Sequence, residues 1–252
     1  LEIAKSKNPF VSVSIDGIDA GTHEWVRGVE GSFEAAKEGI RNLVNVGIKP
    51  QIIFSVMRKN VDQIEEFIKM AEDVGAGSAK FNVVMPTARG EKLHESLETL
   101  TIKELIDLGR HVEKNLSPKT KIKLFFHYPV AFRSLNFISI GEGCGTCGIF
   151  GILGVMASGY YALCGIGENV PDLVFGKVGR DKLEKVWLEH PILNELRENL
   201  PKNLDGICGK CLMKNRCMGS CIAQNYYSEK RLMAPFWFCK QAEEAGLFPA
   251  SR

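Results

Sequence analysis

Eight cysteines lie between residues 144 and 239, and their types and spacing indicate metal chemistry. The tightest group begins at Cys208 and ends at Cys221, with the spacing C-x2-C-x5-C-x3-C. Spacers this short let thiolates converge on one metal centre from a turn and the first turn of a helix. Upstream, Gly159 and Cys164 form G-x4-C, and a single cysteine follows the group at position 239. Eight thiolates are enough for two iron–sulfur clusters with four cysteine ligands each.

Three other interpretations of the cysteines stay open on spacing alone. A disulfide framework suits small secreted chains, but nothing here resembles a signal peptide and 252 residues can bury a core without cross-links. Paired C-x2-C units are also typical of structural zinc sites. Some of the cysteines could simply be buried free thiols. Spacing by itself therefore leaves the metal undecided.

The whole cysteine pattern resembles the SPASM domain, the auxiliary-cluster extension of radical S-adenosylmethionine (SAM) enzymes. The shared pattern is C-x(9–15)-G-x4-C, a gap, C-x2-C-x5-C-x3-C, a second gap and a last cysteine. The resemblance implies two auxiliary [4Fe–4S] clusters rather than zinc. By analogy with related enzymes, one cluster would be held by Cys144, Cys147, Cys164 and Cys221, and the other by Cys208, Cys211, Cys217 and Cys239.

Composition narrows the partners and the compartment. With 252 residues, 45% of them hydrophobic, the chain can form one large domain or two modest ones. The net charge of +2 predicts that the chain has no nucleic-acid partner. The sequence also has no block of Lys and Arg residues of the kind that binds a membrane surface. Residues 143–167 are uncharged, but their glycines and cysteines favour a buried loop and hairpin over a membrane span. Eight cysteines without a secretory segment favour the reducing cytoplasm.

Strand and helix patterns alternate in the first half of the chain. Apolar β-branched runs predict strands, helical periodicity predicts the helices between them, and this order is typical of parallel βαβ units. The polar stretch from Gly17 to Gly31 is expected to be a loop. The predicted strands are residues 10–16, 51–57, 80–85 and 121–126, and the predicted helices are residues 33–45, 61–74 and 102–115.

The cysteine-rich half predicts shorter elements. Residues 153–157 and 160–163 flank Ser158-Gly159 and are expected to pair as a hairpin. Two short helices are expected at residues 181–188 and 192–200. A further helix, from Cys217 to about residue 228, is expected to carry the last two ligands of the tight motif.

A second resemblance lies in the first half. The segment from Ser12 to Gly17, followed by His23, Arg27-Gly28 and Gly31-Ser32-Phe33, resembles the fourth strand and following loop of the radical SAM partial barrel. The resemblance implies that Ser14 contacts the methionyl or ribose part of SAM and that Arg27 contacts its carboxylate. Val84, or the preceding valine, would then lie near the adenine. Taken singly, Ser14 and Asp16 are equally explained as capping groups and Arg27 as a solvated loop charge.

The chain departs from the radical SAM pattern at one decisive motif. Radical SAM chemistry needs a C-x3-C-x2-C loop after the first strand, and here no cysteine precedes Cys144. We therefore expect that this chain corresponds to barrel strands four to six followed by a SPASM domain, and that alone it cannot cleave SAM. Gly165 also replaces the aspartate that acts as base in sulfatase-maturing relatives. The sequence assigns no catalytic acid or base.

Together these observations predict an α/β protein. The C-terminal half of a radical SAM partial (β/α)6 barrel is expected over residues 1–117, a bridge over residues 118–143, and a cysteine-rich α+β SPASM domain over residues 144–252. The implied function is a portion of a maturase that modifies a ribosomally made peptide or protein. SAM and a third [4Fe–4S] cluster would act in the full-length enzyme, and ferredoxin or flavodoxin would donate electrons. The alternative is a non-catalytic iron–sulfur or zinc module that docks a peptide or a partner enzyme.

Overall fold

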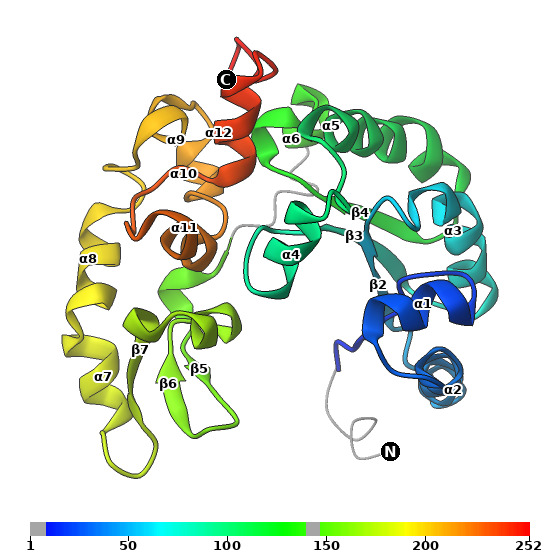
Figure 1. Cartoon of the computed structure of the whole chain (residues 1–252), viewed down its shortest axis with the longest axis horizontal. Coiled ribbons are helices and arrows are strands. Elements are labelled where there is room, and N and C mark those ends of the chain that lie inside the picture. Colours follow the sequence, from blue (N-terminus) through cyan, green and yellow to red (C-terminus); the bar gives the residue numbers. More distant parts are fainter. Residues whose placement is uncertain (1–8, 140–146) are drawn as a thin grey trace. The chain divides into compact units, whose positions relative to one another are not determined.

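The chain folds into two compact units. This computed structural model describes residues 9–139 and 147–252. The first unit consists of Leu1–Val84 and Leu93–Tyr128, and the second of Met85–Lys92 and Pro129–Arg252 (Figure 1). The boundaries expected at residues 117 and 143 stay a prediction.

A four-stranded parallel sheet with the order β1-β2-β3-β4 forms the centre of the first unit. Because all four strands run the same way, their carboxyl ends meet at one edge of the sheet. The segment expected to be a bridge contributes the fourth strand, which pairs with β3. The strands are β1 (Ser12–Ser14), β2 (Gln51–Val56), β3 (Ser78–Val83) and β4 (Lys123–His127).

Aromatic side chains from three strands and one helix form the core of this unit. Phe54, Phe81 and Phe126 occupy matching register positions on β2, β3 and β4. The ring of Phe67, from α3, lies 4.5 Å from that of Phe54 and 5.8 Å from that of Phe81, and all four residues are almost fully buried. Such tilted and edge-on pairs add to the free energy gained by burial. The helices are α1 (Ala20–Arg27), α2 (Ser32–Asn45), α3 (Ile64–Asp73), α4 (Arg89–Glu95) and α5 (Ile102–His111).

The stretch from Gly17 to Gly31 is not a continuous loop, and that prediction was wrong. It contains α1, whose N-terminus is capped by Asp19 through a hydrogen bond from the Thr22 backbone N–H at 2.8 Å. Gly28 ends the helix with φ of 69°, a left-handed conformation that glycine adopts without strain. The helix buries two residues, Thr22 and His23, so its sequence lacks the apolar stripe that announces a longer helix.

The second unit contains a three-stranded antiparallel sheet and short helices. The predicted hairpin is confirmed as β5 (Gly154–Val155) and β6 (Tyr160–Ala162), and β7 (Val174–Lys177) adds a third strand beside β6. The two helices expected near residues 181–200 are confirmed with small shifts of their ends. The helices are α6 (Leu135–Ser139), α7 (Leu183–Glu189), α8 (Pro191–Asn199), α9 (Gly206–Lys210), α10 (Lys214–Cys217), α11 (Ile222–Glu229) and α12 (Trp237–Glu244).

The helix expected from Cys217 to about residue 228 is broken in two. Met218, Gly219 and Ser220 all have positive φ angles, of 54°, 76° and 60°. Three left-handed residues in a row cannot continue a right-handed helix. Cys217 therefore ends α10, and Cys221 immediately precedes α11.

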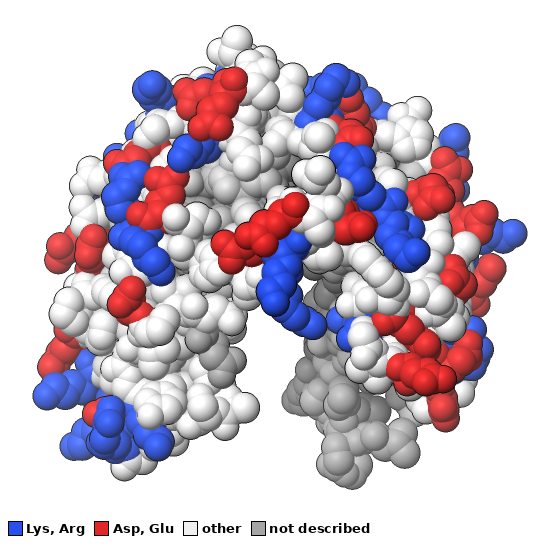
Figure 2. Space-filling view, in the orientation of Figure 1, with Lys and Arg blue, Asp and Glu red and all other residues white. Residues whose placement is uncertain are grey.

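The surface carries charges of both signs. Figure 2 shows acidic and basic side chains interspersed on the face that it draws, in keeping with 32 basic and 30 acidic residues in the chain. No helix in the described part of the chain combines the length and the apolar composition that a membrane span requires.

Candidate functional site

Four cysteines of the second unit line one partly open hollow. They are Cys208, Cys211, Cys217 and Cys239, called here the Cys208 group. Within the described residues, no three His, Cys, Asp or Glu side chains are arranged to hold one metal ion. The seven described cysteines are all free thiols.

Short elements bring these four thiols together. Cys208 lies in α9, Cys211 follows that helix directly, Cys217 ends α10, and Cys239 lies in the first turn of α12. The loop between the first two is tight, because a Cβ on Gly209 would lie 2.1 Å from the carbonyl oxygen of Leu204. Glycine is therefore required there for the backbone to pass.

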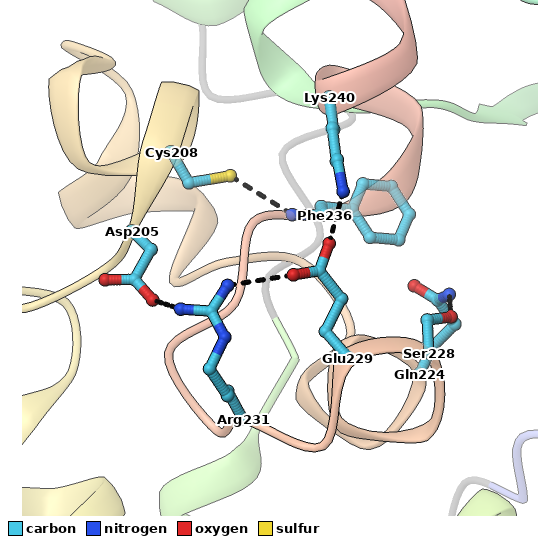
Figure 3. A network of polar contacts seen from close by, with 8 residues as sticks. All are labelled: Asp205, Cys208, Gln224, Ser228, Glu229, Arg231, Phe236 and Lys240. Carbon is cyan, nitrogen blue, oxygen red and sulfur yellow. Dashed lines mark hydrogen bonds and ion pairs between the residues drawn. The ribbon is translucent and has the colours of Figure 1, made fainter.

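Backbone N–H groups point at the sulfurs of the Cys208 group. The Phe236 N–H donates to Cys208 Sγ at 3.3 Å (Figure 3). The Met213 N–H donates to Cys211 Sγ, also at 3.3 Å. Such donors stabilise thiolates and sulfur-ligated iron, so this donor set fits an iron–sulfur cluster.

Burial keeps most of these thiols protonated in the metal-free chain. Burial raises the pKa of Cys217 to about 12, and its thiol neighbours add to this. A hydrogen bond to Cys208, followed by burial, raises the pKa of Cys239 well above its usual value. The same hydrogen bond lowers the pKa of Cys208, which accepts it. Metal binding must therefore release protons from this site.

Three further cysteines form a second group, called here the Cys164 group: Cys147, Cys164 and Cys221. Burial raises the pKa of Cys221 to about 11, and the neighbouring Cys164 and Cys147 add to this. Burial and then Cys164 raise the pKa of Cys147. Cys144 lies outside the described residues. The two groups have the membership of the two predicted ligand sets, as far as they are described, and iron ligation stays a prediction.

A network of ion pairs ties together the elements that carry the Cys208 group (Figure 3). Glu229, the last residue of α11, pairs with Lys240 of α12 at 2.7 Å and with Arg231 at 2.8 Å. Arg231 also pairs with Asp205, the residue before α9. Because the network links the start of α9, the end of α11 and the middle of α12, it restrains the loops between these helices.

At the carboxyl edge of the parallel sheet, a second polar network surrounds Asp16. This residue is completely buried, forms an ion pair of 2.6 Å with Arg27 and accepts the Ser55 N–H at 2.7 Å. The backbone N–H of Asp16 donates to Nδ1 of buried His23 at 3.0 Å. The Asn60 side chain donates to the carbonyls of Asp16 and Ser55, both at 2.9 Å.

Two of the three residues expected to contact SAM lie at or just after the carboxyl ends of strands of the parallel sheet, and the third ends a helix. Ser14 is the last residue of β1, Val84 follows β3, and Arg27 ends α1. The Val84 carbonyl accepts a hydrogen bond from His94 Nε2 at 2.9 Å. The Arg27 side chain is 34% exposed, so donors beyond those facing Asp16 can reach a ligand. The roles of these residues stay predictions.

Several curated proteins resemble the chain, although no protein-family model matches it. It is 27% identical over 242 residues to the AdoMet-dependent heme synthase of Oleidesulfovibrio alaskensis, covering 90% of this chain and 60% of that protein. It is 28% identical over 246 residues to the mycofactocin maturase MftC of Mycolicibacterium smegmatis, covering 93% and 58%. The chain thus spans about 60% of the length of the curated relatives it matches.

Solved structures decide the fold. Streptococcus suis SuiB bound to precursor peptide SuiA aligns with a TM-score of 0.68 at 17% identity, over 94% of this chain and 55% of that chain. Native anSMEcpe with bound AdoMet and Kp18Cys peptide aligns with a TM-score of 0.62 at 16% identity, over 93% and 65%. Both are radical SAM enzymes with SPASM domains. The chain has the radical SAM/SPASM fold.

The radical SAM/SPASM fold confirms the predicted α/β class. Sequence reasoning missed two parts of the site that depend on backbone direction rather than on residue type. These are the N–H donors of Met213 and Phe236 and the position of Lys214, which lines the hollow. The sequence feature that could have identified Lys214 was its place between two predicted ligand cysteines. Lysines are too common on protein surfaces for that feature to be specific.

Proposed function

We propose that this chain is a portion of a radical SAM/SPASM maturase that modifies a ribosomally made peptide or protein. The observation that carries the proposal is the Cys208 group, four free thiols around one hollow with backbone N–H groups directed at the sulfurs. Support for a peptide substrate comes from the mycofactocin maturase and from SuiB with its bound precursor peptide. A tetrapyrrole is the second candidate substrate, because other relatives are heme synthases.

The chain's own residues would act as ligands and as positioning groups. The Cys208 group would hold one [4Fe–4S] cluster, and the Cys164 group with Cys144 would hold the other. With four thiolates each, both clusters would be fully ligated, which favours electron transfer and scaffolding over direct substrate coordination. When bound in the full-length enzyme, SAM and a third cluster supply a radical that abstracts a hydrogen atom from the substrate.

At the sheet edge, Ser14, Arg27 and Val84 would bind SAM. The guanidinium of Arg27 suits a carboxylate, and its ion pair with Asp16 would fix its orientation. Asp16 is completely buried, so its carboxylate is kept away from water. A ferredoxin or flavodoxin would supply electrons in the cytoplasm, where the thiols stay reduced.

Reductive titration after anaerobic reconstitution tests the cluster assignment. Electron paramagnetic resonance should detect two separate one-electron signals in the wild-type chain. Cys217→Ser should remove one signal and Cys164→Ser the other, because each variant lacks one ligand of a different group. A chain that instead binds zinc and gives no redox signal would support the alternative, a binding module for a peptide or partner enzyme.

Incubation with SAM and a strong reductant tests the expected inactivity of the chain alone. The sequence holds no C-x3-C-x2-C motif, so we expect no 5′-deoxyadenosine. Its formation at a rate above that of the protein-free control would show that SAM is cleaved without that motif.

A further inference from the structure

Among the described residues that line the hollow of the Cys208 group, one is a lysine and none is an arginine, aspartate or glutamate. Among the described residues that line the hollow, Lys214 alone is charged, and apart from the four thiols the others are apolar residues or glycine. Lys214 is the first residue of α10, between Cys211 and Cys217. Lys214 is half-buried and contributes to the lining of the site.

A hydrogen bond holds the Lys214 side chain against the ligand loop. Lys214 Nζ donates to the carbonyl oxygen of Gly209 at 2.9 Å. Gly209 lies between Cys208 and Cys211, so the ammonium is anchored to the backbone that joins two of the four ligands. An anchored cation loses less of its electrostatic effect to side-chain motion than a free surface lysine does.

Two further charges act on these thiols, in opposite directions. Burial raises the pKa of Cys211, and the positive charge of Arg252 opposes this shift. The hydrogen bond from Cys239 lowers the pKa of Cys208, and the negative charge of Glu243 opposes that shift. Neither Arg252 nor Glu243 is among the residues that line the hollow. Lys214, by contrast, is one of the lining residues.

A cation at this place has a definite effect on a redox centre. Each electron that a thiolate-ligated cluster accepts adds one negative charge to the site. Lys214 would stabilise the more negative, reduced form, and the apolar lining would strengthen this attraction because it screens charge less than water does. Net charge and hydrogen bonds near the sulfurs are recognised determinants of cluster potential.

We propose that Lys214 is a redox-tuning residue that raises the reduction potential of the cluster held by Cys208, Cys211, Cys217 and Cys239. This inference rests on the proposed function, since it requires a cluster in the hollow. Its consequence is that this cluster accepts an electron more readily than the same ligands would allow without the lysine.

Potentiometric titration of the reconstituted chain, followed by electron paramagnetic resonance, tests the inference. Dithionite and redox mediators supply one electron to each cluster, and the midpoint potential is recorded for each signal. Lys214→Gln keeps an N–H donor for the Gly209 carbonyl but removes the charge, and Lys214→Arg keeps the charge. Lys210→Met is the matched control, because Lys210 lies in the same loop but is exposed and does not line the hollow.

We expect Lys214→Gln to shift one midpoint potential downward and to leave the other in place. Lys214→Arg should stay close to wild type, and Lys210→Met should shift the same signal less than Lys214→Gln does. The signal that shifts should be the one that Cys217→Ser abolishes. Lys214→Met provides a second neutral variant if Lys214→Gln binds less iron.

Three outcomes would overturn the inference. They are an unchanged potential in both neutral variants, equal shifts for Lys214→Gln and Lys210→Met, or a shift in the signal that Cys164→Ser removes. In each of these cases the clusters are present, so the proposed function survives. A wild-type chain without redox-active iron would overturn the inference together with the proposed function.

Discussion

At the residue scale, the protonation of the predicted ligand thiols differs between the metal-free and metal-loaded forms of the site. Cys217, Cys221 and Cys239 are held in surroundings that disfavour the thiolate, with the pKa of Cys217 raised to about 12 and that of Cys221 to about 11. Burial is the first cause for Cys217 and Cys221, and the hydrogen bond to Cys208 is the first for Cys239. Iron would replace these protons, so the metal-free and loaded forms of the site differ in charge as well as in content.

The raised pKa of Cys217 predicts how the stability of the metal-free chain depends on pH. In the unfolded chain the thiol ionises near its ordinary value of 9.0, whereas in the folded chain it stays protonated up to about 12. The unfolded state therefore binds fewer protons above pH 9, and the stability that Cys217 contributes is lost as pH rises from about 9 to about 12. Urea unfolding at a series of pH values should show a smaller alkaline loss of stability for Cys217→Ala than for wild type. Parallel pH profiles would contradict the expected effect of burial.

Asp16 gives a second prediction at the residue scale. Asp16→Asn removes the charge that faces Arg27 but leaves an oxygen for the Ser55 N–H. Because Asp16 is completely buried and Arg27 is partly exposed, we expect a loss of about 2 kcal/mol in the free energy of unfolding. Urea denaturation measures this, with Glu30→Gln as an exposed control in the same segment. Equal stability of the two variants would mean that the ion pair does not support the sheet edge.

Among the elements, α5 shows how local sequence positions a helix. Its N-terminus has a capping box, in which Thr101 accepts the Glu104 N–H and the Glu104 side chain accepts the Thr101 N–H. Arg58 forms two hydrogen bonds with Glu104, at 3.0 and 3.1 Å. The helix supplies buried Leu105 and Ile106 to the core of the first unit.

Loss of this cap should destabilise the first unit. Thr101→Ala should cost about 1 kcal/mol of unfolding free energy, and the exposed acid variant Asp107→Asn on the same helix should cost less.

Hydrogen bonds from Arg58, followed by those from Thr101, lower the pKa of Glu104 from 4.5 to about 2. Its contribution to stability is present above pH 4.5 and is lost as pH falls toward 2. Acid unfolding of Glu104→Gln should consequently be less steep than that of wild type, and identical acid profiles would contradict the assignment.

The long, periodic elements could be predicted from the sequence, and the short ones could not. Strands such as β2 and helices such as α3 have apolar residues at the spacing that their geometry requires. By contrast, α1 buries only two residues, so its sequence has no apolar stripe. The helix break at residues 218–220 has Met218 and Ser220 in the left-handed backbone conformation, which amino-acid composition does not reveal. The same limit applies to the site. Cysteine spacing indicated metal ligation and the resemblance to the SPASM domain implied which thiols share a centre, whereas the N–H donors and Lys214 depend on where the backbone turns.

At the scale of the whole molecule, the chain combines two units of different architecture. The first has a parallel sheet with polar networks at its carboxyl edge. The second has its thiols on short helices and loops that ion pairs connect. The similarity to SuiB and anSMEcpe covers both units, so the radical SAM/SPASM fold extends over most of the chain.

The central claim is that eight thiols hold two four-iron clusters, and metal analysis tests it most directly. Iron, acid-labile sulfide and zinc should be measured per chain on protein purified and reconstituted without oxygen. We predict about eight iron atoms and about eight sulfides in the wild type, falling to about four of each in Cys217→Ser. About four of each in the wild type would mean that Cys144, Cys147, Cys164 and Cys221 do not hold a cluster. Zinc without sulfide would contradict the account as a whole.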